Sequence, residues 1–113
     1  MTIERLGKGG RMSQAVVHDN IAYLSGQVGS GATVAEQTLD ALAEVDKWLA
    51  EAGTDKSRIL SVTVWLADMA GFDEMNGVYD RWIDPDNPPA RAAGESQLAT
   101  PDYLVEFMVV AAR

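Results

Sequence analysis

The chain of 113 residues contains no cysteine and a single histidine. Without cysteine there can be no disulfide bridge, no thiolate nucleophile and no metal site built on sulfur. The one histidine, His18, lies beside a predicted tight turn, which argues against a histidine-based metal site or a Ser-His-Asp triad. The sequence therefore argues against thiol and metal chemistry.

Basic residues are also scarce, with nine Lys and Arg against seventeen Asp and Glu and a net charge of -8. Neutralisation of phosphate dominates nucleic-acid binding, so this charge disfavours RNA and DNA as partners, and it disfavours anionic membrane surfaces equally. No apolar run approaches the roughly 20 residues that span a bilayer, and residues 1–5 lack the apolar stretch of a secretory signal. We therefore expect a cytoplasmic protein that binds neither nucleic acid nor membranes.

The length and the hydrophobic fraction of 47% are those of one globular domain, which we assign to residues 1–113. A chain of this size buries roughly 65% of the surface that its unfolded form exposes, which suffices for one core. Little area then remains for a deep pocket within the chain. A ligand site at an interface between subunits is the natural expectation.

The order of predicted elements indicates an α/β (α+β) fold of the form β-β-α-β-α-β-β. Strand patterns cover residues 14–18, 21–26, 59–67, 92–98 and 103–111, and Asp19-Asn20 suits the tight turn of a first hairpin. Thr33 to Glu36 reads as a capping box that opens a helix ending at Gly53, and Asp68 is a plausible N-cap for a second helix. This order predicts a mixed sheet with both helices on one face. Residues 59–67 have apolar groups at both parities, which predicts a central strand covered on both faces.

Glu106 is the one ionisable residue in an otherwise apolar strand pattern. A carboxylate buried there must be paired, hydrogen-bonded or protonated, because burying it bare costs many kcal/mol. Burial would raise its pKa toward the range useful in general acid–base catalysis. The pattern alone leaves open the alternative of a structural salt bridge at an edge or a subunit seam.

Arg91 follows the rigid segment Pro88-Pro89-Ala90 and opens a strand pattern. Its guanidinium offers a planar fork of donors matched to a carboxylate, at about 1.5–3 kcal/mol for each charge-assisted bond. The pattern alone favours the alternative of a structural arginine that pairs with Glu95 or Asp84.

Two weaker candidates lie elsewhere. Ser25-Gly26-Gln27 ends a strand where a hydroxyl and backbone amides can face a ligand, and Asn76 interrupts the apolar face of the second helix. No Gly-x-Gly-x-x-Gly spacing follows Ser25, so nucleotide binding has no support.

Taken together, these residues resemble the RidA (YjgF-type) family of imine/enamine deaminases, from about Gln14 to Ala111. No single piece is specific, but the pieces occur jointly and in the family's order. They are Ser25-Gly26-Gln27, Ala50-Glu51-Ala52-Gly53, Val62-Thr63-Val64-Trp65-Leu66-Ala67-Asp68, Phe72 through Asn76 with Tyr79, Pro89-Ala90-Arg91, and Val105-Glu106.

The resemblance implies a chorismate-mutase-like fold and a homotrimer with active sites between subunits. It implies hydrolysis of reactive 2-imino and 2-enamino acids to 2-keto acids and ammonia, without a cofactor or a metal. Arg91 would bind the substrate carboxylate, and Glu106 would activate water and shuttle protons. Ser25, Ala93 and Asn76 would complete the site.

Two departures from the family pattern bear on substrate range. Met12, with Arg11 beside it, stands where archetypal members carry a tyrosine, and Ala93 replaces a common cysteine. The segment after Gln27 is also shorter, so these features suggest a divergent subgroup that keeps the arginine. Two alternatives remain: a non-enzymatic trimer that binds 2-keto acids and regulates a partner, and a ribonuclease, which the charge of -8 disfavours.

Overall fold

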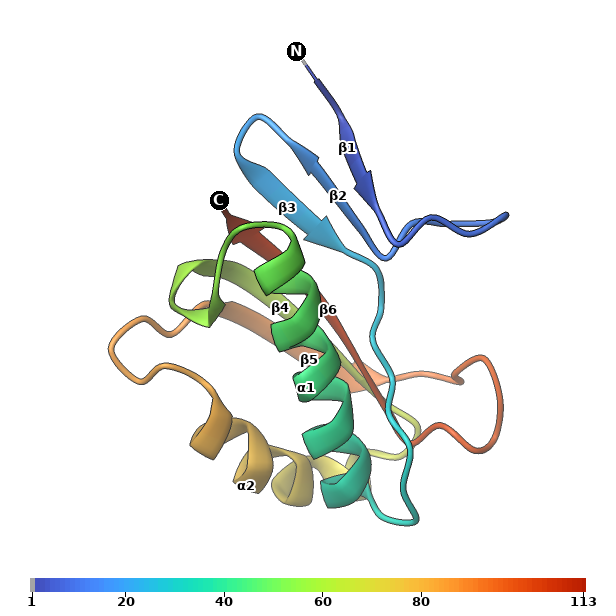
Figure 1. Ribbon diagram of the computed structural model, residues 1–113. Coiled ribbons are helices and arrows are strands. Elements are labelled where there is room, and N and C mark those ends of the chain that lie inside the picture. The colour runs from blue at the N-terminus through green and yellow to red at the C-terminus, as the bar shows by residue number, and fades with distance from the viewer. Residues whose placement is uncertain (1) are drawn as a thin grey trace.

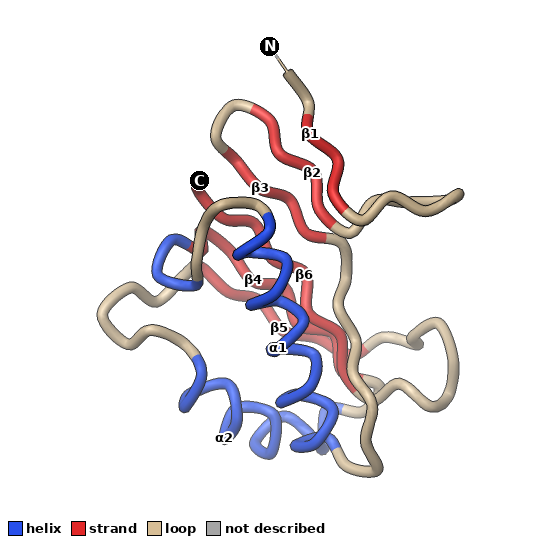
Figure 2. Tube along the Cα trace, in the orientation of Figure 1, coloured by secondary structure: helices blue, strands red, loops and turns tan. Residues whose placement is uncertain are grey.

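The computed structural model describes residues 2–113, which form a six-stranded mixed sheet with two helices on one face (Figure 1). The strand order is β1-β2-β3-β6-β4-β5; β4 and β5 run parallel, and the other neighbours are antiparallel. The strands are β1 (Glu4–Leu6), β2 (Ala15–His18), β3 (Ile21–Leu24), β4 (Ile59–Leu66), β5 (Ala90–Glu95) and β6 (Val105–Ala112). The predicted mixed sheet with both helices on one face is confirmed, and Figure 2 shows the two layers separately coloured.

The sequence patterns predicted five of these six strands. β1 has only three residues, two of them charged, so it carries no alternation long enough to detect. The predicted hairpin between β2 and β3 is present, with Asp19 and Asn20 at φ 52° and 63°. These left-handed conformations are the ones that a two-residue hairpin turn requires.

Helix α1 (Val34–Glu51) begins and ends where the sequence predicts. The Glu36 amide, one of those that the helix leaves unpaired, donates to Thr33 Oγ1 at 3.1 Å, and the Thr33 hydroxyl donates in turn to Glu36 Oε1 at 3.1 Å. Gly53 follows the helix at φ +82°, the left-handed conformation that glycine adopts without strain.

Helix α2 (Phe72–Trp82) starts later than its predicted cap implies. Asp68 does act as a cap, but of the 3-10 turn η2 (Met69–Gly71), where its Oδ1 accepts from the Ala70 amide at 2.9 Å. The cap prediction was therefore right about the residue and wrong about the element. A second 3-10 turn, η1 (Lys56–Arg58), leads into β4.

The core lies between the helices and one face of the sheet. On β4, Val62, Val64 and Leu66 are buried against the helices, while Ser61 and Trp65 alternate with them on the other face and stay partly exposed. The prediction that this strand is covered on both faces is thus wrong for the single chain, since neither helix lies on the second face (Figure 1). That open face includes Tyr23 and Met108, 49% and 43% exposed.

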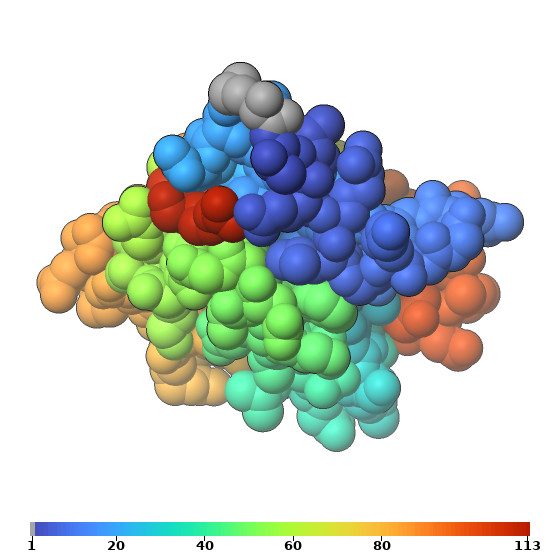
Figure 3. Space-filling view, turned by 45° about the horizontal axis from the view of Figure 1, so that its top comes forward, coloured from blue at the N-terminus to red at the C-terminus, as the bar shows by residue number. Residues whose placement is uncertain are grey.

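The two ends of the described chain lie together. Arg113 Nη1 donates to Glu4 Oε2 at 2.8 Å, and the Arg113 amide donates to the Asn20 carbonyl at 2.8 Å. Figure 3 shows the first strand and the C-terminus side by side on the surface. Neither helix within residues 2–113 is long and apolar enough to cross a membrane.

Candidate active site

Helix α2 holds the guanidinium of Arg91 in a fixed position. Arg91 Nη1 donates to Asn76 Oδ1 at 2.8 Å, and Cζ lies 4.7 Å from the ring centroid of Tyr79 and 5.8 Å from that of Phe72. We call Phe72, Asn76 and Tyr79 the arginine cradle. Their spacing of four and three residues puts them on one side of the helix, and β5 presents Arg91 to that side.

The arginine cradle orients the guanidinium without neutralising it. Asn76 is neutral, and stacking on aromatic faces favours a cation. Burial raises the pKa of Tyr79 above its usual 10.0, although the positive charge of Arg91 opposes the shift, so this hydroxyl keeps its proton at neutral pH. One of the five guanidinium donors is used by Asn76, which leaves donors for an incoming carboxylate.

Glu106 lies at one end of the sheet, in a second group of predicted residues. On β6 it is paired in register with Trp65 of β4, and its carboxyl group packs against Gly26. A Cβ at residue 26 would lie 2.7 Å from Glu106 Cδ, so only glycine leaves room for this carboxylate. We call Ser25, Gly26 and Glu106 the glutamate corner.

Glu106 is partly exposed rather than buried, because it lies on the open face of the sheet. The prediction of a strongly desolvated carboxylate requires full burial of Glu106. One chain alone does not provide that burial. The Ser25 hydroxyl donates to the Ser13 carbonyl at 2.6 Å, and the Ser25 carbonyl accepts from Gln27 Nε2 at 3.1 Å. Ser25 thus ties the segment before β2 to the end of β3.

The sheet separates the arginine cradle from the glutamate corner. Arg91 is paired with Val62, whose side chain is buried beneath the helices, whereas Glu106 is paired with Trp65 on the open face. Neighbouring residues across a sheet point to the same face, and successive residues along a strand point to opposite faces. Arg91 and Glu106 of one chain therefore lie on opposite faces, and a small ligand cannot touch both side chains.

The two remaining predicted residues, Ala93 and Asn76, both lie near Arg91. Ala93 follows Arg91 by two residues on β5 and shares its face, paired with Val64. Asn76, which the family resemblance implies would help to complete the site, has its amide oxygen occupied by Arg91. Sequence reasoning missed Tyr79 and Phe72 as partners of Arg91, because apolar rings at helical spacing are typical of core residues.

Met12, at the position of the family tyrosine, is 47% exposed and lines a hollow of about 480 Å³ with Gly26 and Gln27. Gln27 is buried there, and its Nε2 donates to Gln14 Oε1 at 3.0 Å. Within residues 2–113 there is no group of three His, Cys, Asp or Glu side chains placed to hold a metal ion.

A mixed sheet with helices on one face and an arginine held by the second helix defines a small α+β domain of YjgF type. A solved YjgF-family protein of Neisseria meningitidis matches it with a TM-score of 0.99 and 44% identity, covering 100% of this chain and 96% of that one. The described shape, including β1, is thus shared along the whole length.

Sequence comparison gives the same result. The family described as Endoribonuclease L-PSP matches residues 2–113. A RutC family protein of Haemophilus ducreyi is 45% identical over 112 residues, which cover 97% of this chain and 96% of the relative. The human 2-iminobutanoate/2-iminopropanoate deaminase is 33% identical over 118 residues, with coverage of 97% and 85%. The chain belongs to this family, also called the YjgF or RidA family, which confirms the resemblance seen in its sequence.

Proposed function

We propose that the protein hydrolyses reactive 2-imino and 2-enamino acids to 2-keto acids and ammonia. The observation that carries the proposal is the arginine cradle, which presents a charged and oriented guanidinium at an exposed position. The human relative, by its name, is a deaminase of 2-iminobutanoate and 2-iminopropanoate, both of which are carboxylates. In a chain of net charge -8, a local cation is needed to bind such an anion.

In this proposal Arg91 fixes the substrate and does no proton chemistry. A bidentate contact to the carboxylate would set the imine carbon in one place, and such positioning can replace much of the entropic cost of the reaction. Asn76 acts through Arg91 as a positioning residue. Ala93, close to Arg91 on the same face, contributes backbone groups at the edge of the site.

Glu106 carries the proton transfers. Water adds to the carbon of the protonated C=N bond, the iminium form, while the carboxylate takes one of the water protons, which gives a neutral carbinolamine. The carboxylic acid then returns this proton to nitrogen, the C–N bond breaks, and ammonia leaves while the hydroxyl proton passes back to the carboxylate as the C=O bond forms. Hydration of an imine is intrinsically easy, so this modest assistance suffices.

A complete site requires two chains under this proposal. Arg91 and Glu106 lie on opposite faces of their own sheet, so the Glu106 that serves a given Arg91 belongs to a neighbouring copy. The open face, with Tyr23 and Met108 exposed, supplies an apolar surface for such a neighbour. A homotrimer, as the family resemblance implies, would form three such sites.

The test is the decay of 2-iminopropionate and other imino acids, generated in place by an amino-acid oxidase. Wild-type protein should accelerate the decay, and Arg91→Ala should lose nearly all of that effect. Arg58→Ala, which removes an exposed arginine from η1, is the matched control and should behave as wild type. An unchanged decay rate across the whole set of imino acids would refute the proposal.

A second function follows from the same cradle: non-catalytic binding of 2-keto acids. One chain alone offers the Arg91 guanidinium without Glu106, so carboxylate binding can occur without hydrolysis. Calorimetry that shows 2-keto acid binding, lost in Arg91→Ala, together with no imine turnover, would select this alternative. Ribonuclease activity, which the family description names, is disfavoured by the charge of -8 and by a single histidine, placed at the β2–β3 turn.

A further inference from the structure

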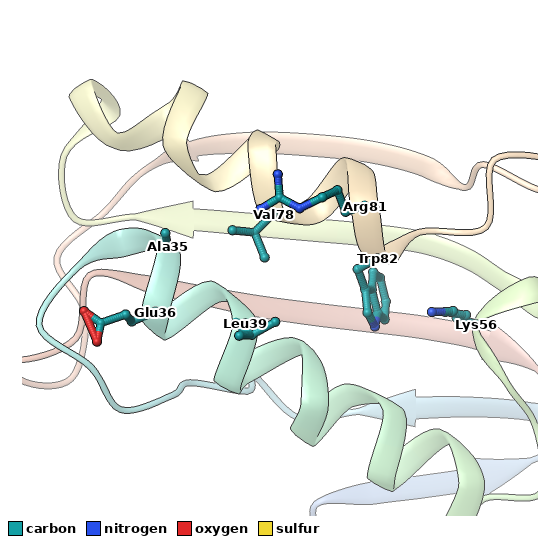
Figure 4. A pocket seen from close by; sticks show the side chains of 7 residues that line it. All are labelled: Ala35, Glu36, Leu39, Lys56, Val78, Arg81 and Trp82. Carbon is teal, nitrogen blue, oxygen red and sulfur yellow. The ribbon is translucent and has the colours of Figure 1, made fainter.

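A groove of about 430 Å³ lies between α1 and α2, away from the sheet (Figure 4). Its lining comes from both helices and from η1: Ala35, Glu36, Leu39, Lys56, Val78, Arg81 and Trp82. Volumes of this order are those of small-molecule sites. Neither the arginine cradle nor the glutamate corner contributes a side chain to this groove.

The middle of the groove is apolar. Leu39 is 67% exposed although it lies on α1 directly across from α2, and Val78 and Trp82 face it from the other helix (Figure 4). Trp82 is fixed from two sides: its Nε1 donates to Asp46 Oδ2 at 2.9 Å, and its ring lies 5.9 Å from that of Tyr79. A leucine left in water beside an immobilised indole is surface that an apolar group would cover favourably.

Charge divides the groove into two ends. Glu36 lies at the end near the start of α1, where its carboxylate accepts a hydrogen bond from the Thr33 hydroxyl. Lys56 lies beside Trp82 at the other end, with its Nζ 5.4 Å from the indole centroid, whereas the Arg81 side chain extends toward Val78 near the middle of the groove (Figure 4). Neither cation forms a salt bridge with any residue from 2 to 113.

Asp84, whose negative charge interacts with Lys56, already accepts hydrogen bonds from its own loop. Both oxygens of Asp84 are occupied, Oδ1 by the Asp86 amide at 3.0 Å and Oδ2 by Asn87 Nδ2 at 2.9 Å. These bonds lower the pKa of Asp84, so that carboxylate stays ionised and turned to its own loop. Lys56 and Arg81 therefore line an apolar groove without a salt-bridge partner among residues 2–113, so both can attract an anion from outside.

We propose that this groove binds an amphipathic monocarboxylate, with its aromatic or branched apolar part on Leu39, Val78 and Trp82. The carboxylate would lie at the Trp82 end against Lys56, with Arg81 lining the groove on the α2 side. The groove is on a different side of α2 from the arginine cradle, since positions 78, 81 and 82 are rotated away from 72, 76 and 79 on the helix. It is a second ligand site, independent of imine hydrolysis.

The test uses 4-phenylbutyrate as the probe and the three tryptophan indole N–H signals in ¹H–¹⁵N NMR spectra. The Trp82 signal, assigned with Trp82→Phe, should shift saturably with a Kd on the order of 1 mM. The Trp48 and Trp65 signals serve as internal references for the fold. The neutral 4-phenylbutyramide should bind several-fold more weakly, because it lacks the charge that Lys56 and Arg81 recognise.

Variants separate this site from the arginine cradle. The double variant Lys56→Gln/Arg81→Gln should weaken binding by about fivefold or more, whereas Lys8→Gln, in the N-terminal loop, should leave it unchanged. Arg91→Lys should also bind the probe as wild type does. Loss of the Trp82 shift in Arg91→Lys, equal binding in the double variant, or a Trp82 signal that does not respond would each overturn the proposal.

Discussion

At the scale of single residues, Tyr79 has two roles, in the core and beneath Arg91. It is only 5% exposed, and burial raises the pKa of its hydroxyl above 10.0 against the opposing charge of Arg91. A folded state that keeps its proton longer than the unfolded state loses stability as pH rises, because the unfolded chain then binds fewer protons. The free energy of unfolding should therefore fall as pH rises from about 10 through the folded-state pKa.

Tyr79→Phe should remove this alkaline loss of stability. The variant keeps the ring beneath Arg91 but has no hydroxyl to titrate, so its unfolding free energy should depend less on pH above about 10. Urea unfolding at neutral and alkaline pH measures the effect, and the difference between the wild-type and variant tyrosinate absorbance curves should have its midpoint above pH 10. A midpoint at or below the ordinary value would contradict the argument.

Gly26 matters for a different reason, namely the space that it leaves for Glu106. In Gly26→Ala the new methyl group would overlap the Glu106 carboxylate, which can swing away at little cost because it ends a flexible, partly exposed side chain. We expect a change in unfolding free energy of less than about 1 kcal/mol. Imine hydrolysis should fall by about 10- to 100-fold, since small displacements of a catalytic group cost that much. Normal activity in a folded Gly26→Ala protein would show that the position of Glu106 is not critical.

Single-residue patterns could identify Glu106 and Arg91 as candidates but not their surroundings. Glu106 stood out because a single ionisable residue in an apolar strand pattern is a local signal, and the structure places it within strand β6. The partners of Arg91 lie 12 to 19 positions earlier, on another element, so no local pattern joins them. The burial expected for Glu106 failed because a strand pattern does not tell which face the helices cover.

At the scale of elements, the capping box of α1 is the clearest case of local sequence deciding structure. Thr33→Ala removes the side chain that accepts from the Glu36 amide, and loss of such a cap typically costs about 1 kcal/mol. The melting temperature should fall by about 4–6 °C for a domain of this size. Thr33→Ser keeps the hydroxyl and should melt close to wild type. Equal losses in both variants would mean that the methyl group of Thr33, rather than its hydrogen bond, is what stabilises the helix.

The helices and strands were predictable in proportion to the length of their sequence pattern. The helical pattern of α1 extends over 18 residues and has a signal at each end, and its predicted bounds agree with the structure. β1 has three residues and exists only because β2 pairs with it, a non-local cause that the sequence does not display. The cap at Asp68 was assigned to the wrong element, because a 3-10 turn and an α-helix begin with the same side-chain contact.

At the scale of the whole molecule, the open face of the sheet explains why β4 has apolar residues at both parities. The helices cover one face and bury Val62, Val64 and Leu66, while Trp65 lies on the other. β4 has the apolar pattern of a strand covered on both faces, but its own chain covers only one face. This is the pattern expected if the open face forms an interface with another copy of the chain. The prediction that both faces of β4 are covered is wrong for a single chain. It would be right only in an assembly in which a second chain covers the open face.

A mixing experiment tests whether Arg91 and Glu106 act across chains. Arg91→Ala and Glu106→Gln should each be inactive alone in imine hydrolysis, since each lacks one half of every site. Unfolded together and refolded as a mixture, they should form some sites with an intact Arg91 from one chain and an intact Glu106 from its neighbour. If equal amounts assemble at random, about a quarter of the sites should be restored, because each half is intact in half of the chains.

The control is each variant refolded with itself, which should stay inactive. A light-scattering mass near three times 12.2 kDa for the mixture would establish that the chains assemble as trimers. An inactive mixture of correctly assembled trimers would place both residues of a site on one chain. That outcome would contradict the geometry, because the two side chains project from opposite faces of the sheet that they share.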